Sequence, residues 1–290
     1  MSPRVCLLGF GEVGQALATG LRGRVDQLRA WDLRFADDSS PPARAAASLG
    51  VVAAPDAATA VRDADVIISA VTAAQIGPAA HSVAAHLARE AWYLDLNSPS
   101  PAAKIEAADI VNARGGRFVE AAVMSPIQPS GAASPMLMGG GHAAAFQPLA
   151  SQLGFTHVRV LPGKLGSASA AKMCRSVLVK GLEALVLESL LAARRHGVQE
   201  VVLDSLRGLR IDDWRQGARY MISRALLHGS RRAEELREVS RTVGEAGFTP
   251  HMSSAGVMWQ EWAAAHAQVA GETDLARLLD ELAAPRKGQA

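Results

Sequence analysis

A glycine-rich turn near the N-terminus constrains the fold more than any other feature of this sequence. The apolar run Val5–Leu8 leads directly into Gly9-Phe10-Gly11-Glu12-Val13-Gly14. Apolar residues then recur at Val13, Leu17 and Leu21, which is the spacing of one face of a helix. A G-x-G-x-x-G motif between a buried strand and a helix is typical of the phosphate-binding turn of a Rossmann-type βαβ unit.

The three glycines have separate roles in such a turn. Gly9 permits the sharp change of direction, Gly11 allows a diphosphate to approach the backbone, and Gly14 lets the helix pack closely on the strand. The amides and the dipole at the helix N-terminus favour the phosphate charge. The motif therefore predicts that residues 9–14 bind the pyrophosphate of a dinucleotide. The alternative is a tight turn that binds no ligand.

Residues at the ends of two further strands bear on the cofactor. Asp32 ends the second expected strand, where a carboxylate accepts the adenosine ribose hydroxyls of NAD and repels the 2′-phosphate of NADP. Arg34 could bind such a phosphate, so we expect NAD or NADP, with NAD favoured. For Asp32, the alternative is a solvated strand-end carboxylate. Val71 and Thr72 follow the fourth strand, where the loop would pass under the cofactor, and Thr72 either donates a hydrogen bond there or caps the next helix.

Short apolar runs alternate with helical patterns in the first part of the chain. The expected strands are Val5–Leu8, Leu28–Asp32, Val51–Ala53, Val66–Val71, Trp92–Leu96, Phe118–Ala122, Met136–Met138 and Val158–Leu161. Helical stretches such as Glu12–Arg22 and Pro78–Arg89 lie between them. This alternation predicts an α/β Rossmann-type domain, in which helices cover both faces of a mostly parallel sheet.

The pattern changes near Pro162-Gly163. One helical pattern without proline runs from Ser167 to His196, and only helical patterns follow it. Breaks between these helices are expected near Gly208, Gly229-Ser230, Gly247–Pro250 and Gly271. We therefore predict a dinucleotide-binding domain over residues 1–162. Residues 163–290 are predicted to form a connecting helix and an all-α C-terminal domain for substrate binding and dimerisation.

Composition excludes several classes of partner. The net charge of +2 over 290 residues is too small to attract nucleic acid or an anionic membrane surface. The sequence contains no apolar run of the length that a membrane span requires. Cys6 and Cys174 form no CxxC pair, and the histidines have no metal-ligand spacing. We expect a cytoplasmic protein that binds no metal.

Four polar residues lie near the start of the long helical pattern. At 100° per residue, Lys172, Arg175, Ser176 and Lys180 fall on one side of the helix. Such a group suits a small anionic substrate and a lysine that transfers a proton. A solvated basic stripe is the alternative interpretation.

Several dispersed motifs, taken in order, resemble the β-hydroxyacid dehydrogenases, the family that contains 3-hydroxyisobutyrate and 6-phosphogluconate dehydrogenases. The motifs are the glycine turn, Asp95–Pro101, Phe118–Pro126, Met138–Gly141 and Gly163–Ser176. The C-terminal part resembles a poorly characterised branch with a 6-phosphogluconate dehydrogenase-like NAD-binding domain.

The resemblance implies roles for individual residues. Lys172 matches the lysine that serves as general acid/base in the family. Ser176 stands where the family has asparagine, and Arg175 stands where the 6-phosphogluconate enzymes have histidine. Both are expected to hold substrate together with Lys180. The resemblance further implies that Asn97 and Ser98 contact the nicotinamide and substrate. Ser125 lies where the family has a substrate-binding Ser-Gly-Gly, and a structural turn is the alternative there.

The resemblance thus implies NAD(P)-dependent hydride transfer between the nicotinamide and a β-hydroxy acid or a related alcohol, in a homodimer formed through the C-terminal helices. Two alternatives are kept open. One is NAD(P)H-dependent imine reduction, against which Lys172 counts because imine reductases of related fold commonly lack the lysine. The other is a non-catalytic dinucleotide-binding sensor or assembly protein.

Overall fold

The computed structural model describes residues 2–206 and 214–284. The chain forms two compact units, Met1–Met173 and Cys174–Ala290. The boundary predicted between residues 162 and 163 lies ahead of the long helix α7 (Ser167–Arg195), whereas the two units meet within that helix. Each unit is described below by itself.

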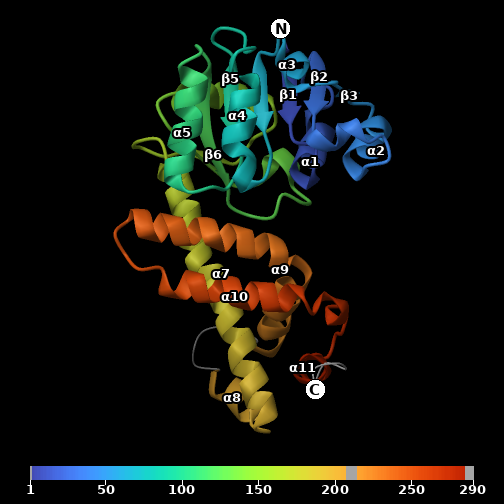
Figure 1. The fold of residues 1–290 in the computed structure, drawn as a ribbon, viewed down its shortest axis with the longest axis vertical. Coiled ribbons are helices and arrows are strands. Elements are labelled where there is room, and N and C mark those ends of the chain that lie inside the picture. Colours follow the sequence, from blue (N-terminus) through green and yellow to red (C-terminus); the bar gives the residue numbers. More distant parts are fainter. Residues whose placement is uncertain (1, 207–213, 285–290) are drawn as a thin grey trace. The chain divides into compact units, whose positions relative to one another are not determined.

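An eight-stranded sheet forms the centre of unit 1 (Figure 1). Its strands are β1 (Arg4–Leu8), β2 (Gln27–Trp31), β3 (Val52–Ala53), β4 (Val66–Ser69), β5 (Trp92–Asp95), β6 (Arg117–Val123), β7 (Met136–Gly139) and β8 (Val158–Val160). The strand order is β3-β2-β1-β4-β5-β6-β7-β8. All neighbours are parallel except β6 and β7, which are antiparallel. The sheet confirms the Rossmann-type fold class.

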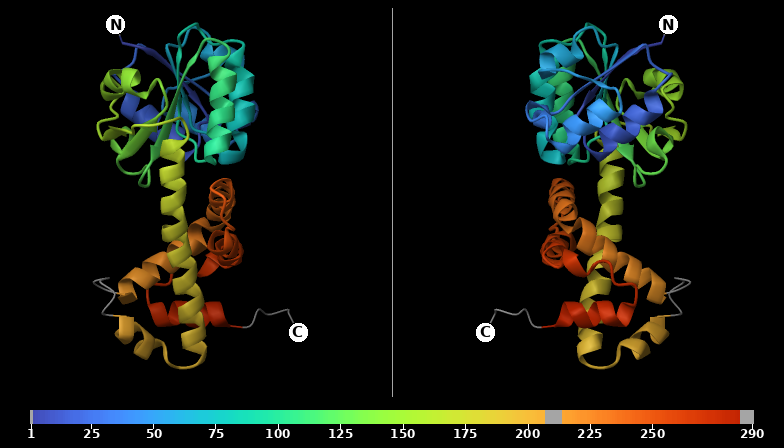
Figure 2. Two further views of the ribbon diagram at one scale, coloured as in Figure 1. Left: turned by 90° about the vertical axis from the view of Figure 1, so that its left-hand side faces the viewer. Right: turned by 90° about the vertical axis from the view of Figure 1, so that its right-hand side faces the viewer.

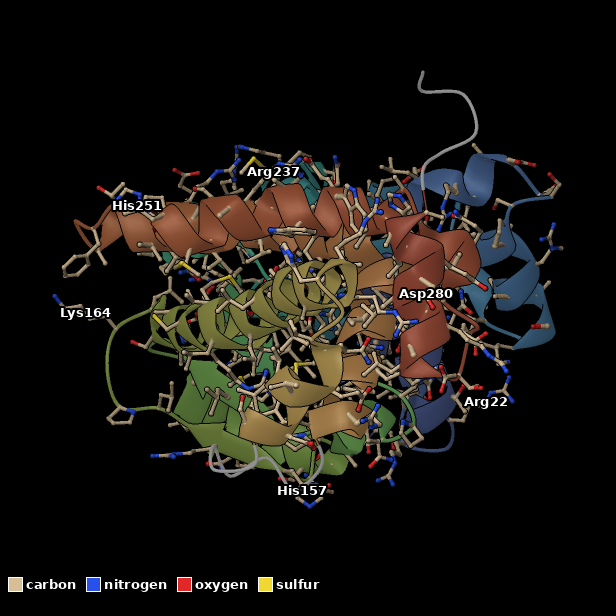
Figure 3. All side chains as sticks on the ribbon, turned by 90° about the horizontal axis from the view of Figure 1, so that it is seen from below. Arg22, His157, Lys164, Arg237, His251 and Asp280 are labelled. Carbon is tan, nitrogen blue, oxygen red and sulfur yellow. The ribbon has the colours of Figure 1, made fainter. Side chains whose placement is uncertain are left out.

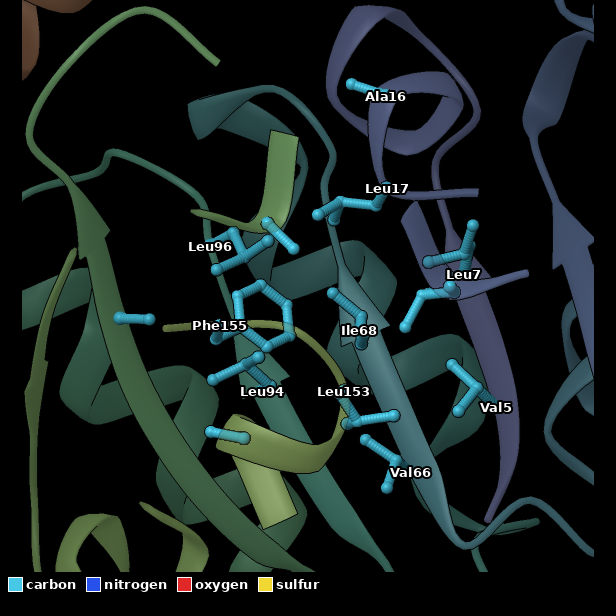
Figure 4. Close-up of a cluster of buried hydrophobic side chains, with 14 of the residues drawn as sticks. Val5, Leu7, Ala16, Leu17, Val66, Ile68, Leu94, Leu96, Leu153 and Phe155 are labelled. Atoms are coloured by element: carbon cyan, nitrogen blue, oxygen red, sulfur yellow. The ribbon is translucent and has the colours of Figure 1, made fainter. Parts of the chain in front are cut away.

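Helices cover both faces of this sheet (Figure 2). The helices are α1 (Glu12–Leu21), α2 (Pro41–Ser48), α3 (Ala57–Val61), α4 (Ile76–Ala84), α5 (Pro101–Asn112) and α6 (Ala143–Gln152). Strand side chains alternate between two cores, so Leu7 packs with α1, α2 and α6, and Cys6 packs with α3, α4 and α5. Figure 4 shows the first core, in which Leu17 lies near Leu7 and Phe155 lies near Leu94.

The secondary structure described in unit 2 consists of helices joined by short turns. It contains the rest of α7 with α8 (Gln199–Ser205), α9 (Trp214–Glu245), α10 (His251–Ala264) and α11 (Leu275–Ala283). Its apolar core joins Leu187 of α7, Ile222 of α9 and Leu278 of α11. Ion pairs join these helices at the periphery, where Arg237 of α9 meets Glu261 of α10 and Arg194 of α7 meets Asp280 of α11 (Figure 3).

The helix break predicted near Gly229-Ser230 is wrong, because α9 continues through both residues. A Cβ atom at Gly229 would overlap the carbonyl oxygen of Gln260 and lie 2.8 Å from the amide nitrogen of Ala264. This glycine therefore allows α9 and α10 to approach closely and does not end a helix. The breaks predicted at Gly247–Pro250 and Gly271 are present, and the one near Gly208 lies outside the described residues.

No helix within the described parts of the chain is both long enough and apolar enough to cross a bilayer.

Candidate cofactor and proton-transfer site

The glycine turn lies at the point where the strand order changes direction. β1 is paired with β2 on one side and with β4 on the other, and Gly9 directly follows β1. In open α/β sheets this switch point, at the carboxyl ends of the strands, is where ligands bind. Gly9 has a φ of +91°, and a Cβ atom there would overlap the carbonyl oxygen of Ala70. A Cβ atom at Gly14 would overlap the carbonyl oxygen of Gly9. Both glycines are therefore needed for the tight turn.

The start of α1 is open to a ligand. Gly11 is the N-cap residue of α1, and no side chain caps this helix end. A Cβ atom built on Gly11 would have no neighbouring atom within 4 Å. An α-helix leaves its first amides without partners inside the helix, and phosphate oxygens satisfy such amides well. The turn therefore fits the pyrophosphate of a dinucleotide.

Asp32 follows β2 and bonds directly to the glycine turn. Its Oδ2 accepts a hydrogen bond from the backbone nitrogen of Phe10 at 2.8 Å, and its Oδ1 accepts one from the backbone nitrogen of Arg34 at 2.9 Å. The Asp32 side chain is 13% exposed, and the Arg34 guanidinium, 3.7 Å away, is 59% exposed. Asp32 therefore orients the turn, a task that the sequence motif does not indicate.

Val71 and Thr72 follow β4 at the same edge of the sheet. The backbone nitrogen of Val71 donates to Oδ1 of Asn97 at 2.7 Å, which links two of the predicted site residues. Thr72 is the N-cap residue of the short 3₁₀ helix η2 (Ala73–Gln75), but its side chain makes no capping hydrogen bond. The helix cap that was the alternative for Thr72 is therefore not formed.

A buried polar network behind Asn97 was not foreseen from the sequence. Nδ2 of Asn97 donates to Oγ of Ser69 at 2.8 Å and to Oδ2 of Asp95 at 2.7 Å. Asp95 pairs with Lys104 of α5, and both side chains are fully buried. The Lys104 amine also donates to the carbonyl oxygens of Asp95, at 2.9 Å, and of Ala121, at 3.3 Å. The network therefore links the ends of β4 and β5 to β6.

The sequence contained one hint of this network. Lys104 shares a helical face with Ala107, Ala108 and Val111, which are buried. A lysine on the apolar face of a short helix implies a buried partner, because an unpaired buried charge is costly.

Lys172 lies at the second turn of α7 and contacts the loop after β5. Its Nζ is 2.6 Å from Oγ of Ser98, and its side chain is half-buried. One turn earlier, Oγ of Ser169 donates to the carbonyl oxygen of Pro99 at 2.5 Å. The structure thus brings together two predicted site residues, Lys172 and Ser98, from parts of the chain 74 positions apart.

Arg175, Ser176 and Lys180 belong to unit 2. Nζ of Lys180 is 2.9 Å from Oε2 of Glu235 on α9, and it donates to Oγ of Ser176 at 3.3 Å. Burial lowers the pKa of Lys180 below its ordinary value, and the neighbouring Glu235 carboxylate offsets only part of this shift. The solvated basic stripe therefore does not describe Ser176 and Lys180, which are both buried, whereas Arg175 is exposed.

Ser125 lies apart from these contacts. It is exposed, follows β6, and its hydroxyl donates to the carbonyl oxygen of Pro126 at 3.1 Å. This local contact does not test the predicted role of Ser125 in substrate binding, which stays a prediction.

Within residues 2–206 and 214–284, no group of three or more histidine, cysteine, aspartate or glutamate side chains is placed to hold a metal ion.

The parallel sheet, the open start of α1 and the residues at its edge define a dinucleotide-binding protein of the Rossmann type. Residues 4–155 match the NAD binding domain of 6-phosphogluconate dehydrogenase, and residues 193–263 match a domain of unknown function, DUF1932. The chain therefore belongs to the family with this NAD-binding domain. The predicted resemblance to 6-phosphogluconate and 3-hydroxyisobutyrate dehydrogenases, in a poorly characterised branch, is confirmed.

Solved structures support the same assignment. A conserved hypothetical protein from Sinorhizobium meliloti 1021 is 36% identical, with a TM-score of 0.78, over 98% of this chain and 96% of that one. A conserved protein of unknown function, described as structurally similar to 3-hydroxyacid dehydrogenases, is 31% identical with a TM-score of 0.71 over 93% and 100%. Mycobacterium tuberculosis 3-hydroxyisobutyrate dehydrogenase shares the fold, with a TM-score of 0.73 at 19% identity over 98% and 100%.

Proposed function

We propose that the protein is an NAD(P)-dependent oxidoreductase that transfers hydride between the nicotinamide and a β-hydroxy acid or a related alcohol. One observation carries the proposal. Nζ of Lys172, on α7, lies 2.6 Å from the hydroxyl oxygen of Ser98. Ser98 follows β5, which pairs with β4 in the NAD-binding domain. An amine in this place can exchange a proton with a hydroxyl while hydride moves at the adjacent carbon.

The proposed cofactor contacts follow from the turn and the strand ends. Residues Gly9–Gly14 and the start of α1 would bind the pyrophosphate, and Val71 and Thr72 would lie beside the nicotinamide half. Asp32 would accept hydrogen bonds from the adenosine ribose hydroxyls. Each of its carboxylate oxygens accepts one backbone hydrogen bond, from Phe10 or Arg34, and has a further lone pair available. The bound cofactor supplies or accepts the hydride. We propose NAD as the preferred form, because a 2′-phosphate would meet the Asp32 carboxylate, with Arg34 as the group able to offset that repulsion.

The proposed substrate contacts divide by chemistry. Lys172 holds or releases the proton of the reacting hydroxyl, and Ser98 holds the amine in place. The exposed Arg175 guanidinium is the proposed partner of the substrate anion, because its planar fork matches a carboxylate. Ser176 with Lys180, and Ser125, are proposed as further polar contacts. Asn97 is proposed to contribute to substrate binding indirectly, because its Oδ1 accepts a hydrogen bond from Val71 and so positions the loop after β4.

We also propose that the protein works in the cytoplasm, where thiols remain reduced. Both cysteines are free, and burial raises the pKa of the Cys6 thiol to about 12, so Cys6 resists oxidation.

The test compares wild type with Lys172→Ala across a panel of hydroxy acids, assayed with NAD and NADP separately. We expect Lys172→Ala to lower kcat on the order of 10²–10⁴-fold, the usual contribution of a general acid/base, while the Kd of NADH, measured by its fluorescence, stays unchanged. Lys164→Ala is the matched control, because Lys164 is exposed and precedes the same helix (Figure 3). Turnover retained in Lys172→Ala would refute the assignment.

Cyclic imines and ketone–amine pairs, assayed with NADH and NADPH, are added to the panel to separate the alternatives. An imine reductase would turn over these compounds and leave the hydroxy acids untouched. A sensor or assembly protein would bind NADH without turnover of any member of the panel.

A further inference from the structure

We infer that Glu120 is a positioning residue, which sets the place of the Lys172 amine by holding the first turn of α7. The inference rests on the proposed function, in which Lys172 moves the proton. The carboxylate of Glu120 binds backbone amides at the start of α7, and we infer that its effect reaches Lys172 through the helix backbone.

The Glu120 carboxylate is fully buried on β6 and binds the start of α7 with both oxygens. Oε2 accepts from the backbone nitrogen of Gly166 at 2.7 Å, and Oε1 accepts from the backbone nitrogen of Ser169 at 2.6 Å. These amides belong to the helix end, where backbone donors have no partner within the helix. Two hydrogen bonds accepted by one buried carboxylate fix both the position of the first turn along the helix axis and its rotation about that axis.

The first turn in turn fixes Lys172. Ser169 precedes Lys172 by three residues, so the two lie on neighbouring turns of one helical face. Ser169 also donates through Oγ to the carbonyl oxygen of Pro99, next to Ser98 in the chain. The distance of 2.6 Å between Nζ of Lys172 and Oγ of Ser98 therefore depends on where Glu120 holds Ser169. A misplacement of about 1 Å at a reacting group costs on the order of 10²-fold in rate.

A glycine on the neighbouring strand makes room for the carboxylate. Gly139 of β7 is paired with Glu120 in the sheet register. A Cβ atom at Gly139 would lie 2.8 Å from Oε2 of Glu120 and 3.6 Å from the backbone nitrogen of Ala168. An added methyl group would therefore push the carboxylate or the helix start, while every functional group of the site is retained.

Two variants test the inference by different routes. Glu120→Gln keeps the shape of the side chain but turns one acceptor into a donor that faces a backbone N–H, so one of the two bonds is lost. Gly139→Ala keeps the carboxylate and displaces it. Glu106→Gln, an exposed glutamate on α5, is the matched control.

We expect Glu120→Gln and Gly139→Ala each to lower kcat on the order of 10–100-fold, with the Kd of NADH unchanged. The decisive measurement is a double-mutant cycle with Lys172→Ala. If Glu120 acts through Lys172, Glu120→Gln lowers kcat in the wild-type background and adds little loss in the Lys172→Ala background. A merely structural role would give equal losses in both backgrounds, or would weaken NADH binding, and either result would overturn the inference.

The outcomes also separate this inference from the function on which it rests. Full turnover in Lys172→Ala would refute the proposed function. Loss of turnover in Lys172→Ala, with wild-type kcat in both Glu120→Gln and Gly139→Ala, would refute only the positioning role. If Glu120→Gln does not fold, the cycle is run with Gly139→Ala, and wild-type kcat in that variant overturns the inference.

Discussion

Arg4 and Asp65 join the first strand of the sheet to the residue that precedes β4. The Arg4 guanidinium donates to Asp65 at 3.0 and 3.2 Å, and the Arg4 backbone nitrogen donates at 2.8 Å. The side-chain hydrogen bond from Arg4 lowers the pKa of the Asp65 carboxyl group. Because the folded pKa lies below the unfolded one, this interaction stabilises the fold above the unfolded pKa, and the stabilisation is lost as the pH falls through the folded pKa.

We predict that Asp65→Asn lowers the free energy of unfolding at pH 7 by at most about 1 kcal/mol. The limit is low because the Arg4 and Asp65 side chains are 42% and 46% exposed, and solvent screens the pair. The difference in free energy of unfolding between this variant and wild type should shrink as the pH falls through the folded pKa of Asp65. Urea denaturation at a series of pH values measures it, with the exposed Asp109→Asn as control. A difference that stays constant down to the acid limit would contradict the prediction.

Single residues also show which parts of the site a sequence can predict. Gly9–Gly14 and Asp32 were predicted because their meaning depends on spacing along the chain and on an adjacent strand and helix. Glu120 and Lys104 were not predicted, because their roles depend on partners brought close by folding. Glu120 binds amides 46 and 49 positions away. A charged residue within the apolar run Phe118–Ala122 was the signal that could have located it.

At the scale of elements, the packing of α9 on α10 depends on the absence of one side chain. We predict that Gly229→Ala destabilises the protein by about 1–3 kcal/mol, the usual cost of overpacking. The reason is that the added methyl group would meet backbone atoms of Gln260 and Ala264, which cannot rotate away. Chemical denaturation of the two proteins measures the change.

Gly244→Ala is the matched control for Gly229→Ala. Gly244 also lies within α9, but a Cβ atom there would have no neighbour within 4 Å. Alanine at this position, in the last turn of α9, should therefore change the free energy of unfolding by no more than about 0.5 kcal/mol. Equal effects at positions 229 and 244 would show that propensity, and not packing against α10, decides both.

The same pair explains why elements are predicted unequally well. The strands of unit 1 follow from alternating apolar runs, and all eight expected strands are found within the described residues. A glycine in a helical pattern is ambiguous, because it either ends a helix or admits a neighbouring backbone. Only the position of α10 distinguishes the two for Gly229.

At the scale of the whole molecule, we propose a homodimer formed through the C-terminal helices. On α7, Leu178, Leu182 and Leu185 are 75%, 39% and 50% exposed and share one helical face. A contiguous exposed apolar stripe is uncommon on a monomer, and a second copy of this chain would cover it with an identical stripe.

We predict that Leu178→Glu combined with Leu185→Glu converts the dimer to a monomer, because two charges would be buried at the contact. Sedimentation equilibrium measures the mass of each form. Ile105→Glu is the control, since Ile105 is an exposed apolar residue of α5 in unit 1. A wild-type protein that sediments as a monomer would refute the dimer.

The boundary between the two units divides the proposed site residues on α7 into two groups. It falls after Met173, so the first residues of α7, with Lys172, make their contacts inside the cofactor domain. Arg175, Ser176 and Lys180 follow immediately, in the other unit. In the proposed function, mutations at these three positions can therefore alter polar contacts with the substrate, while Lys172 keeps its contact with Ser98. In the proposed function, a chimaera joined at this residue would keep Lys172, Asn97, Ser98 and Ser125 of one parent and would exchange only the polar contacts that Arg175, Ser176 and Lys180 supply.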